Sequence, residues 1–409
     1  MRKNTTLIAG SLVAFMLAGS GAARAEEVLR FATWTVDNLP ILQEVAKKFE
    51  EKHPGVKVQV EGNGDGFDQK LIAAFGAGNP PDVMYMWNFP QYYTSLMPLD
   101  DLIARDAAEL KPDDFPQGLM NTTRVEGKTY GMPAGFTTQV VFYNKDMFKA
   151  SGIEEPKDGW TWDDLRTIAA KFRNKENKVY GIAVDAKPDP YDFEQFLWSN
   201  GTKYISDDGK AIDGYMNSDA SAAVLDMFGD MLKKEEAVAL NLGGDTSGST
   251  LFNGGKIAML QSAMWSKTSI DAAGINYGVA PLPRFGDKPA KSAIGTSAIS
   301  IAKDTKHADL AWEFVKFYSS PEAVAMRVND LPVRTSVAEQ KGMTKDPIYK
   351  PFFDILAASG SETPAFLKNQ NWTKVQDNLA RAIEATMIDQ GNAKAHLDDA
   401  VKRSQRFLK

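Results

Sequence analysis

The sequence contains no cysteine and only three histidines among its 409 residues. The absence of cysteine excludes disulfides, thiolate metal sites and thiol nucleophiles, and it removes the residue that carries a lipid anchor in many exported proteins. The histidines, His53, His307 and His396, stand far apart, and none has a metal-ligating neighbour at helical or hairpin spacing. We therefore expect neither a metal site nor a cofactor.

Enzyme signatures are equally scarce. No GxSxG elbow is present, so nucleophilic catalysis has no local motif. The glycine-rich stretch 62–66 reads GxGxG and lacks the Lys and Ser/Thr of a phosphate loop, so we interpret it as a polar wall that exposes Asp65. A pair of catalytic carboxylates is defined by a spatial gap and not by sequence spacing, so a glycan-cleaving enzyme stays open as a minor alternative.

Long hydrophobic runs are also missing. The apolar stretch 7–17 is too short for the ~20 residues that span a bilayer. It follows Arg2 and Lys3 and precedes the small residues Ala23 and Ala25, which is the three-part pattern of a cleaved signal peptide. We predict cleavage after Ala25 and, since no cysteine is available for a lipid anchor, a periplasmic product.

An excess of basic charge is absent as well. Removal of residues 1–25 leaves 44 Lys and Arg against 53 Asp and Glu, a net charge of −9. Nucleic-acid binding requires a concentrated positive surface, so we do not expect a nucleic-acid partner. The remaining chain is too long for one hydrophobic core, which indicates two or more domains.

The hydrophobic pattern alternates between strand and helix periods. Segments 28–35, 56–60 and 82–87 have strand character, and apolar residues at helical spacing fill the stretches between them. Strands that alternate with helices predict an α/β fold with a mainly parallel sheet flanked by helices. We predict further strands at 140–143, 180–184, 257–261, 277–281 and 294–302. We predict helices at 162–175, 193–199, 308–318 and 372–387. A hairpin is predicted at 204–212 around Asp207, Asp208 and Gly209.

Aromatic residues are plentiful, with eight Trp, 12 Tyr and 22 Phe. Trp34 and Trp87 both follow predicted parallel strands, and ligands of open α/β sheets bind beyond the carboxyl ends of such strands. A sugar ring offers an apolar face and a rim of hydroxyls, so it requires flat aromatic planes beside polar side chains. Trp34, Trp87, Trp265 and Trp372 have such neighbours, among them Thr35, Asp37 and Asn88, although core packing is an equal alternative for each tryptophan.

Several motifs resemble those of one known family. VEGKTYGMPAGFTTQVVFYNKDMFKASGIEEP at 125–156, LFNGGKIAMLQSAMW at 251–265, YGVAPLPRF at 277–285 and LPVRTSV at 331–337 are similar, in this order, to segments of the extracellular solute-binding proteins of carbohydrate ABC importers. The similarity covers essentially the whole mature chain. It implies a two-lobed fold with three hinge crossovers, a carbohydrate ligand, permease subunits as partners, and a monomer.

The resemblance also implies lobe boundaries. The N-terminal lobe would comprise 26–133 and 298–330, and the C-terminal lobe 138–293 and 336–409. The hinge crossovers would fall near 133–138, 294–297 and 329–336. Lobes joined in this way close on a ligand by rotation about the hinge.

Site residues follow from the same resemblance. Trp265, Trp372 and Tyr191 stand where family members place aromatic ligand contacts, and Gly295, Thr296 and Arg334 lie in crossover segments that often face ligand. Thr137 stands where maltose-binding protein has a glutamate, which makes maltose itself doubtful. Arg334 would pair with an acidic sugar or brace the hinge. Asp37, Asp65 and Asp192 leave a cationic solute such as a polyamine, or iron, as an alternative ligand.

Overall fold

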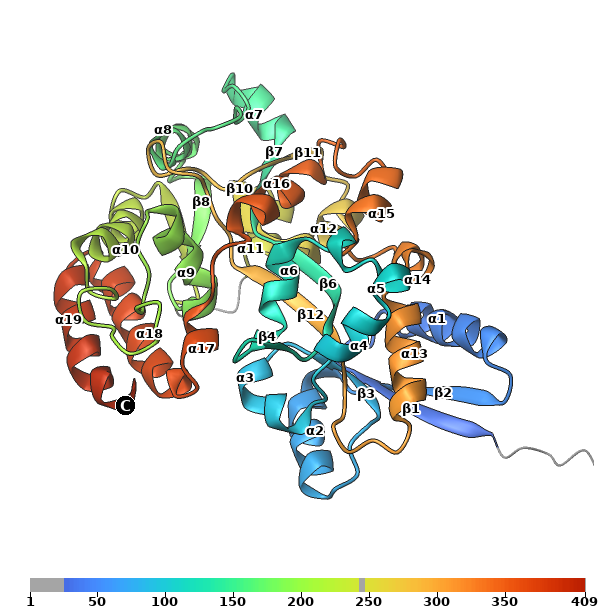
Figure 1. The fold of residues 1–409 in the computed structure, drawn as a ribbon. Helices are drawn as coiled ribbons and strands as arrows, with labels where there is room; N and C mark the ends of the chain where they lie inside the picture. The colour runs from blue at the N-terminus through green and yellow to red at the C-terminus, as the bar shows by residue number, and fades with distance from the viewer. Residues whose placement is uncertain (1–25, 243–246, 409) are drawn as a thin grey trace, which may run out of the picture.

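The computed structural model describes residues 26–242 and 247–408. The predicted signal peptide, residues 1–25, lies outside the described residues. Two five-stranded sheets, each flanked by helices, build two lobes that lie side by side (Figure 1). The expected two-lobed α/β fold is therefore confirmed. No helix in the described part of the chain has the length and apolar character needed to cross a membrane.

The first sheet has the strand order β2-β1-β3-β12-β6. Strand β1 lies between β2 and β3 and pairs in parallel with both. Strand β12 runs antiparallel to β3 on one side and to β6 on the other. The strands are β1 (Glu27–Thr33), β2 (Val56–Gly62), β3 (Val83–Met86), β6 (Met132–Thr138) and β12 (Ile294–Ile301).

The second sheet has the order β11-β7-β10-β8-β9. Strand β8 pairs in parallel with β9 and β10, whereas β7 runs antiparallel to β10 and β11. Half of the strand pairs in each sheet are thus antiparallel, so the sheets are mixed and not mainly parallel as predicted. The strands are β7 (Val140–Asn144), β8 (Tyr180–Asp185), β9 (Ala237–Leu240), β10 (Ile257–Ser262) and β11 (Tyr277–Ala280).

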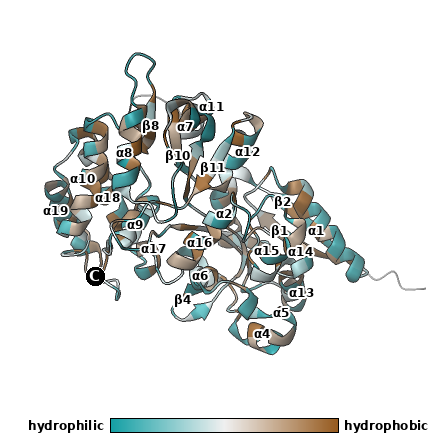
Figure 2. Ribbon diagram, turned by 90° about the horizontal axis from the view of Figure 1, so that it is seen from above, coloured by the Kyte–Doolittle hydropathy of each residue, from teal (hydrophilic) through white to brown (hydrophobic). Residues whose placement is uncertain are grey.

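Amphipathic helices cover both sheets. In α1 the buried residues are Leu42, Val45, Ala46 and Phe49, the helical repeat expected from the sequence. Figure 2 shows that the helices carry hydrophilic and hydrophobic residues together. Along the first sheet lie α1 (Leu39–Lys52), α2 (Phe67–Gly76), α3 (Phe89–Tyr92), α4 (Asp100–Arg105), α5 (Ala107–Leu110), α6 (Gln117–Thr122), α13 (Ala308–Tyr318), α14 (Pro321–Met326) and α15 (Thr335–Gln340).

The helices of the second lobe include two long ones at the C-terminus, α18 (Trp372–Asp389) and α19 (Ala393–Ser404), which pack on each other and on α10 (Asp219–Lys233). A short ribbon of β4 (Arg124–Val125) and β5 (Lys128–Thr129) stands apart from both sheets. The other helices of this lobe are α7 (Lys145–Ser151), α8 (Trp162–Phe172), α9 (Pro190–Ser199), α11 (Gly248–Asn253), α12 (Met264–Ala272) and α17 (Ala365–Lys368).

The chain passes between the lobes at the centre of the molecule. Gln139 is the single residue between β6 of the first sheet and β7 of the second, and residues 281–293 lead back from β11 to β12. Helix α16 (Lys350–Ser359) contacts both lobes, since its Phe353 ring packs on Phe136 of β6 and its Phe352 ring on Phe142 of β7. The lobe boundaries given above remain a prediction, and these contacts favour a third crossing at α16.

The hairpin predicted at 204–212 is wrong. The segment contains a turn, in which the Gly209 amide donates to the Ser206 carbonyl and the Ser206 amide to the Ala211 carbonyl, but no strand. The two ends of the segment contact other parts of the lobe instead. Tyr204 stacks on Trp372, and the Ile212 amide donates to the side chain of Gln405. A turn dipeptide thus fixed the reversal of the chain without providing strand partners.

Candidate ligand-binding site

Two adjoining cavities lie at the junction of the lobes. The first, of about 520 Å³, has walls from both lobes, and we call it the interlobe pocket. The second, of about 390 Å³, is enclosed by elements of the second lobe and by Gln139, and we call it the Trp265 pocket. Asp189 lines both. The two pockets therefore share Asp189 as a wall residue.

The interlobe pocket brings together seven of the fourteen residues predicted from the sequence. Trp34 and Trp87 enter from the first lobe because they follow the parallel strands β1 and β3, whose carboxyl ends meet at this edge. Trp34 packs edge-on against Tyr85 at 5.0 Å, whereas Trp87 is 44% exposed. The seven residues are Trp34, Trp87, Asn88, Tyr191, Gly295, Thr296 and Trp372.

An aromatic bridge crosses this pocket. The ring of Phe366, from α17, lies edge-on 6.4 Å from Trp87 of the first lobe and 5.4 Å from Tyr191 of the second. The Tyr191 hydroxyl donates a 2.7 Å hydrogen bond to the Ile294 carbonyl, and burial raises the pKa of Tyr191 well above its usual range. Phe366 was missed in the sequence because its four-residue helix has no readable period.

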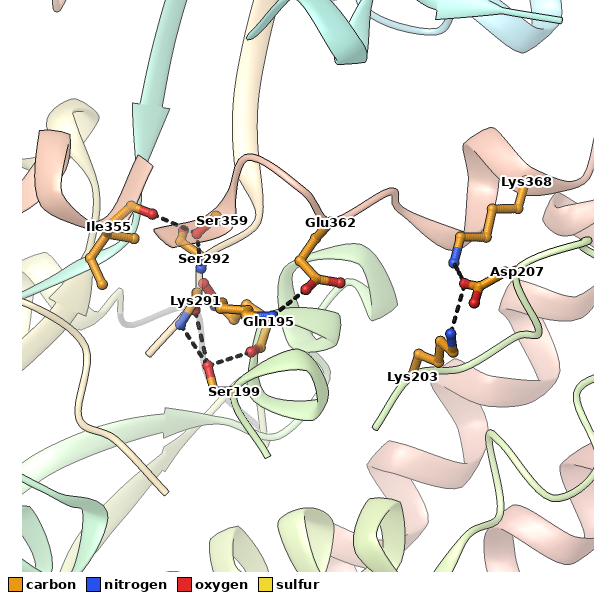
Figure 3. Close-up of polar contacts among 10 residues, drawn as sticks. All are labelled: Gln195, Ser199, Lys203, Asp207, Lys291, Ser292, Ile355, Ser359, Glu362 and Lys368. Atoms are coloured by element: carbon orange, nitrogen blue, oxygen red, sulfur yellow. Dashed lines mark hydrogen bonds and ion pairs between the residues drawn. The ribbon is translucent and has the colours of Figure 1, made fainter. Parts of the chain in front are cut away.

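The segment that carries Phe366 is fastened at several points (Figure 3). Lys291 pairs with Glu362 before α17, and Lys368 at its end pairs with Asp207 at 3.1 Å, beside Lys203 at 2.7 Å. At the start of α17 the buried carboxylate of Glu194 accepts the Ala365 amide, and burial raises the pKa of Glu194 to about 8. Phe366 is thereby held in the wall of the interlobe pocket.

Trp372 contributes to the wall of the pocket mainly through packing. Only 3% of its surface is exposed, and its ring stacks on Tyr204 at 6.0 Å and 27°. Gln376, one turn further along α18, lines the same wall and donates a long 3.4 Å hydrogen bond to Asp189. Trp372 thus serves both the core and the cavity, the two alternatives weighed for each tryptophan.

Asp192 lies in the Trp265 pocket beside the crossover residue Gln139. The Gln139 amide group donates to Asp192 at 3.1 Å and accepts from Gln195 and Gln261 at 2.8 and 2.6 Å. Burial, followed by repulsion from Asp189, raises the pKa of Asp192 to about 6. The first crossover is therefore connected directly to the pocket wall, a role for Gln139 that the sequence did not reveal.

Trp265 lies on α12 at the edge of its pocket and is 62% exposed. Serine hydroxyls lie nearby: Ser266 is 2.6 Å from Ser262 and 2.9 Å from Ser249. A large exposed aromatic ring beside hydroxyl groups offers an apolar face and hydrogen-bonding partners together. This arrangement suits the stacking role expected for Trp265.

Five predicted site residues line neither pocket. The Thr35 amide donates to the Thr33 hydroxyl, and Asp37 and Asp65 lie exposed on the surface. The Thr137 hydroxyl accepts the Met264 amide at 3.2 Å and so joins β6 to α12. None of these four residues therefore lines the interlobe pocket or the Trp265 pocket.

Arg334, the fifth, is 1% exposed. Its guanidinium donates to the carboxylate of Asp114 and to the carbonyls of Leu110 and Ser319, and it lies over the ring of Phe115. With its donors used inside the first lobe, Arg334 braces the segment after α14 and is not placed to pair with an acidic sugar in either pocket.

The histidines and carboxylates of the described residues do not gather into a metal centre. Within residues 26–242 and 247–408, no group of three or more His, Cys, Asp or Glu side chains is arranged to hold a metal ion. Two of the histidines pair with single carboxylates, His307 with Glu27 and His396 with Asp389, and His53 bonds to the Phe49 carbonyl at the end of α1. Each histidine thus has a structural partner in the described part of the chain.

Two α/β lobes with an aromatic pocket between them define a protein that encloses a solute. The chain belongs to the bacterial extracellular solute-binding protein family, whose model matches residues 32–325. It is the solute-binding component of an ABC transporter and not an enzyme, and its family is extracellular or periplasmic.

Curated relatives of the chain match it over nearly its full length. The arabinooligosaccharide-binding protein of Bacillus subtilis is 25% identical, with 98% of each chain covered. The sn-glycerol-3-phosphate-binding periplasmic protein UgpB of Brucella abortus is 22% identical, over 99% of this chain and 98% of the relative. Among solved structures, the sugar-binding protein MalE of Xanthomonas citri superposes with a TM-score of 0.80 at 22% identity, over 93% of this chain and 97% of that one, which confirms the fold.

Proposed function

We propose that this protein captures a sugar or small oligosaccharide in the two joined pockets and delivers it to the permease subunits of an ABC importer. The observation that carries the proposal is the composition of the interlobe pocket, which combines aromatic rings from both lobes with amide and hydroxyl side chains. Its volume of about 520 Å³ falls within the usual range for small-molecule sites.

The mechanism is closure about the hinge. A ligand that contacts Trp87 on one lobe and Tyr191 on the other favours the closed form by its differential affinity for that form. The closed shape is then the state that the permease recognises. Under this proposal the protein acts as a monomer in the periplasm after cleavage behind Ala25. The stacking surfaces are supplied by Trp34, Trp87, Tyr191 and Trp265, and the buried Trp372 supports the pocket wall.

One feature supports a sugar over the cationic alternatives. Asp37 and Asp65, which left a polyamine or iron open as ligand, lie exposed and outside both pockets. Asp192 lines the Trp265 pocket together with Asp185 and Asp189, so a polyamine and iron stay in the panel below as comparison solutes. The relatives that bind an arabinooligosaccharide and glycerol 3-phosphate leave two solute classes to compare.

The test is thermal unfolding of the mature chain against mono-, di- and oligosaccharides, with glycerol 3-phosphate, a polyamine and ferric iron as comparison solutes. A ligand of the folded state at one hundred times its dissociation constant adds about 2.7 kcal/mol of stability. We expect a higher Tm with one class of saccharide and unchanged ligand on recovery. A shift with polyamine or iron alone would keep the fold and overturn the sugar assignment, and product formation would indicate an enzyme.

A further inference from the structure

The charged side chains that line the two pockets are all acidic. Among the described residues that line them there are three carboxylates, Asp185, Asp189 and Asp192, and no lysine, arginine or histidine. All three carboxylates lie in the Trp265 pocket, and Asp189 also faces the interlobe pocket. A phosphate or carboxylate group on a ligand would meet like charge there without a compensating cation.

The lysines next to the pockets in sequence are already engaged. Four lysines directly adjoin a lining residue, and each has a side-chain partner of its own. Neutralising a ligand anion would require breaking these contacts and moving the ammonium group to the cavity. The pairs are Lys187 with Glu384, Lys267 with Asp271, Lys368 with Asp207, and Lys374 with the amide of Asn371.

Arg334 does not supply the missing charge. It is the basic residue that the sequence offered for an acidic sugar, and it is buried against Asp114. The interlobe pocket instead carries five amide side chains, which both donate and accept hydrogen bonds as sugar hydroxyls do. These are Asn88, Gln91, Asn369, Gln370 and Gln376.

We infer that the joined pockets select solutes without formal negative charge and reject solutes that carry phosphate or carboxylate groups. The reason is that the polar wall consists of amides, hydroxyls and carboxylates that have no cationic partner in the pockets. This inference rests on the proposed function and narrows it to neutral saccharides among the classes that the relatives bind. The net charge of the chain, −6 with all residues counted, adds a weaker repulsion in the same direction.

The test compares matched neutral and anionic probes. Glucose is set against glucuronate and glucose 6-phosphate, galactobiose against digalacturonate, and each further neutral saccharide that binds against its uronate; sn-glycerol 3-phosphate is included. Binding is measured by calorimetry and by Tm in 20 mM and 500 mM NaCl. We expect each anionic member to bind at least about tenfold more weakly at low salt. The difference should shrink in part at high salt, because salt screens the exposed Asp189 more than the partly buried Asp192.

A matched pair of variants isolates the cause. Asp192→Asn removes a pocket carboxylate and keeps the side-chain shape, whereas Asp309→Asn removes an exposed carboxylate on α13. Asp192→Asn should narrow the gap between neutral and anionic probes severalfold, and Asp309→Asn should leave it unchanged. In the triple variant that also carries Asp185→Asn and Asp189→Asn, the gap should narrow further, and asparagine still caps α9 at 189.

The outcomes separate this inference from the proposed function. An anionic probe that binds as tightly as its neutral partner, or an unchanged gap in the triple variant, overturns charge selection while sugar binding stands. Binding of glycerol 3-phosphate in preference to every neutral probe does the same. If no saccharide of either charge binds, the proposed function itself fails.

Discussion

Replacement of Trp265 by alanine separates ligand stacking from fold stability. A tryptophan side chain presents on the order of 200 Å² of surface, of which 62% is exposed here, or about 120 Å². A sugar ring that covers half of this area buries about 60 Å², which at ~25 cal/mol per Å² is about 1.5 kcal/mol. Trp265→Ala should therefore weaken saccharide affinity by roughly tenfold.

The same variant should fold normally. Because Trp265 makes few buried contacts, its loss should change the free energy of unfolding by no more than about 0.5 kcal/mol. Trp372 is 3% exposed, so Trp372→Ala should lower the free energy of unfolding by about 3–5 kcal/mol. The contrast follows from burial alone and does not depend on the identity of the ligand.

Isothermal titration calorimetry with the saccharide found in the thermal panel measures the affinity, and urea unfolding measures the stability. Ile388→Ala, at a 55% exposed residue that lines neither pocket, is the matched control and should change neither quantity appreciably. An affinity within twofold of the parent for every saccharide would refute the stacking role of Trp265. A large loss of stability in Trp265→Ala would refute the inference, drawn from its exposed surface, that Trp265 contributes little to folding.

Three further predictions concern the folded chain. Arg334→Ala should lower the free energy of unfolding in urea by about 3–5 kcal/mol, because it breaks the buried ion pair with Asp114. Its saccharide affinity should stay within about twofold of the parent, and a tenfold loss of affinity would contradict this. The raised pKa of Asp192, about 6, means that the folded state holds more protons than the unfolded state between about pH 4 and 6, so stability falls as pH rises through this window. The free energy of unfolding of Asp192→Asn should exceed that of the parent by about 1–3 kcal/mol at pH 7, and the two should become equal near pH 4. A difference that does not depend on pH would contradict the assignment. Gly181→Ala would place a methyl group 2.2 Å from the Cα of Ala169 and should destabilise the lobe by at least about 2 kcal/mol, whereas Gly76→Ala, with open space around it, should not; equal melting temperatures would contradict the packing argument.

The sequence predicted the strands better than their directions. The predicted strand 257–261 is observed as β10 (Ile257–Ser262), and the helix 308–318 is observed as α13 (Ala308–Tyr318). Hydrophobic periodicity marks such elements because it depends on which face of the chain is buried. It carries no information on direction, so the antiparallel pairing of β12 with β3, which makes the first sheet mixed, could not be foreseen.

Site residues at the ends of parallel strands were predictable for a geometric reason. Trp34 and Trp87 follow neighbouring strands of one sheet, so both reach the same edge. Residues placed by crossover segments were less predictable. Arg334 and Thr137 belong to segments predicted as crossovers, yet their side chains bond to other protein groups and line neither pocket. A segment that passes close to a site does not determine where its side chains point.

Gln139 illustrates what lies beyond sequence reasoning. Gln139 carries no sequence motif of its own. Only the structure shows that it is the single residue that joins β6 of one sheet to β7 of the other. Its side chain then binds Asp192 in the Trp265 pocket and accepts from Gln195 and Gln261 of the second lobe. A rotation between the lobes must change backbone angles at the crossovers. Gln139 lies at one crossover, and it also lines the Trp265 pocket. Under the proposed closure, a ligand that contacts Asp192 would act on this crossover through the Gln139–Asp192 hydrogen bond, and binding and closure would be coupled there.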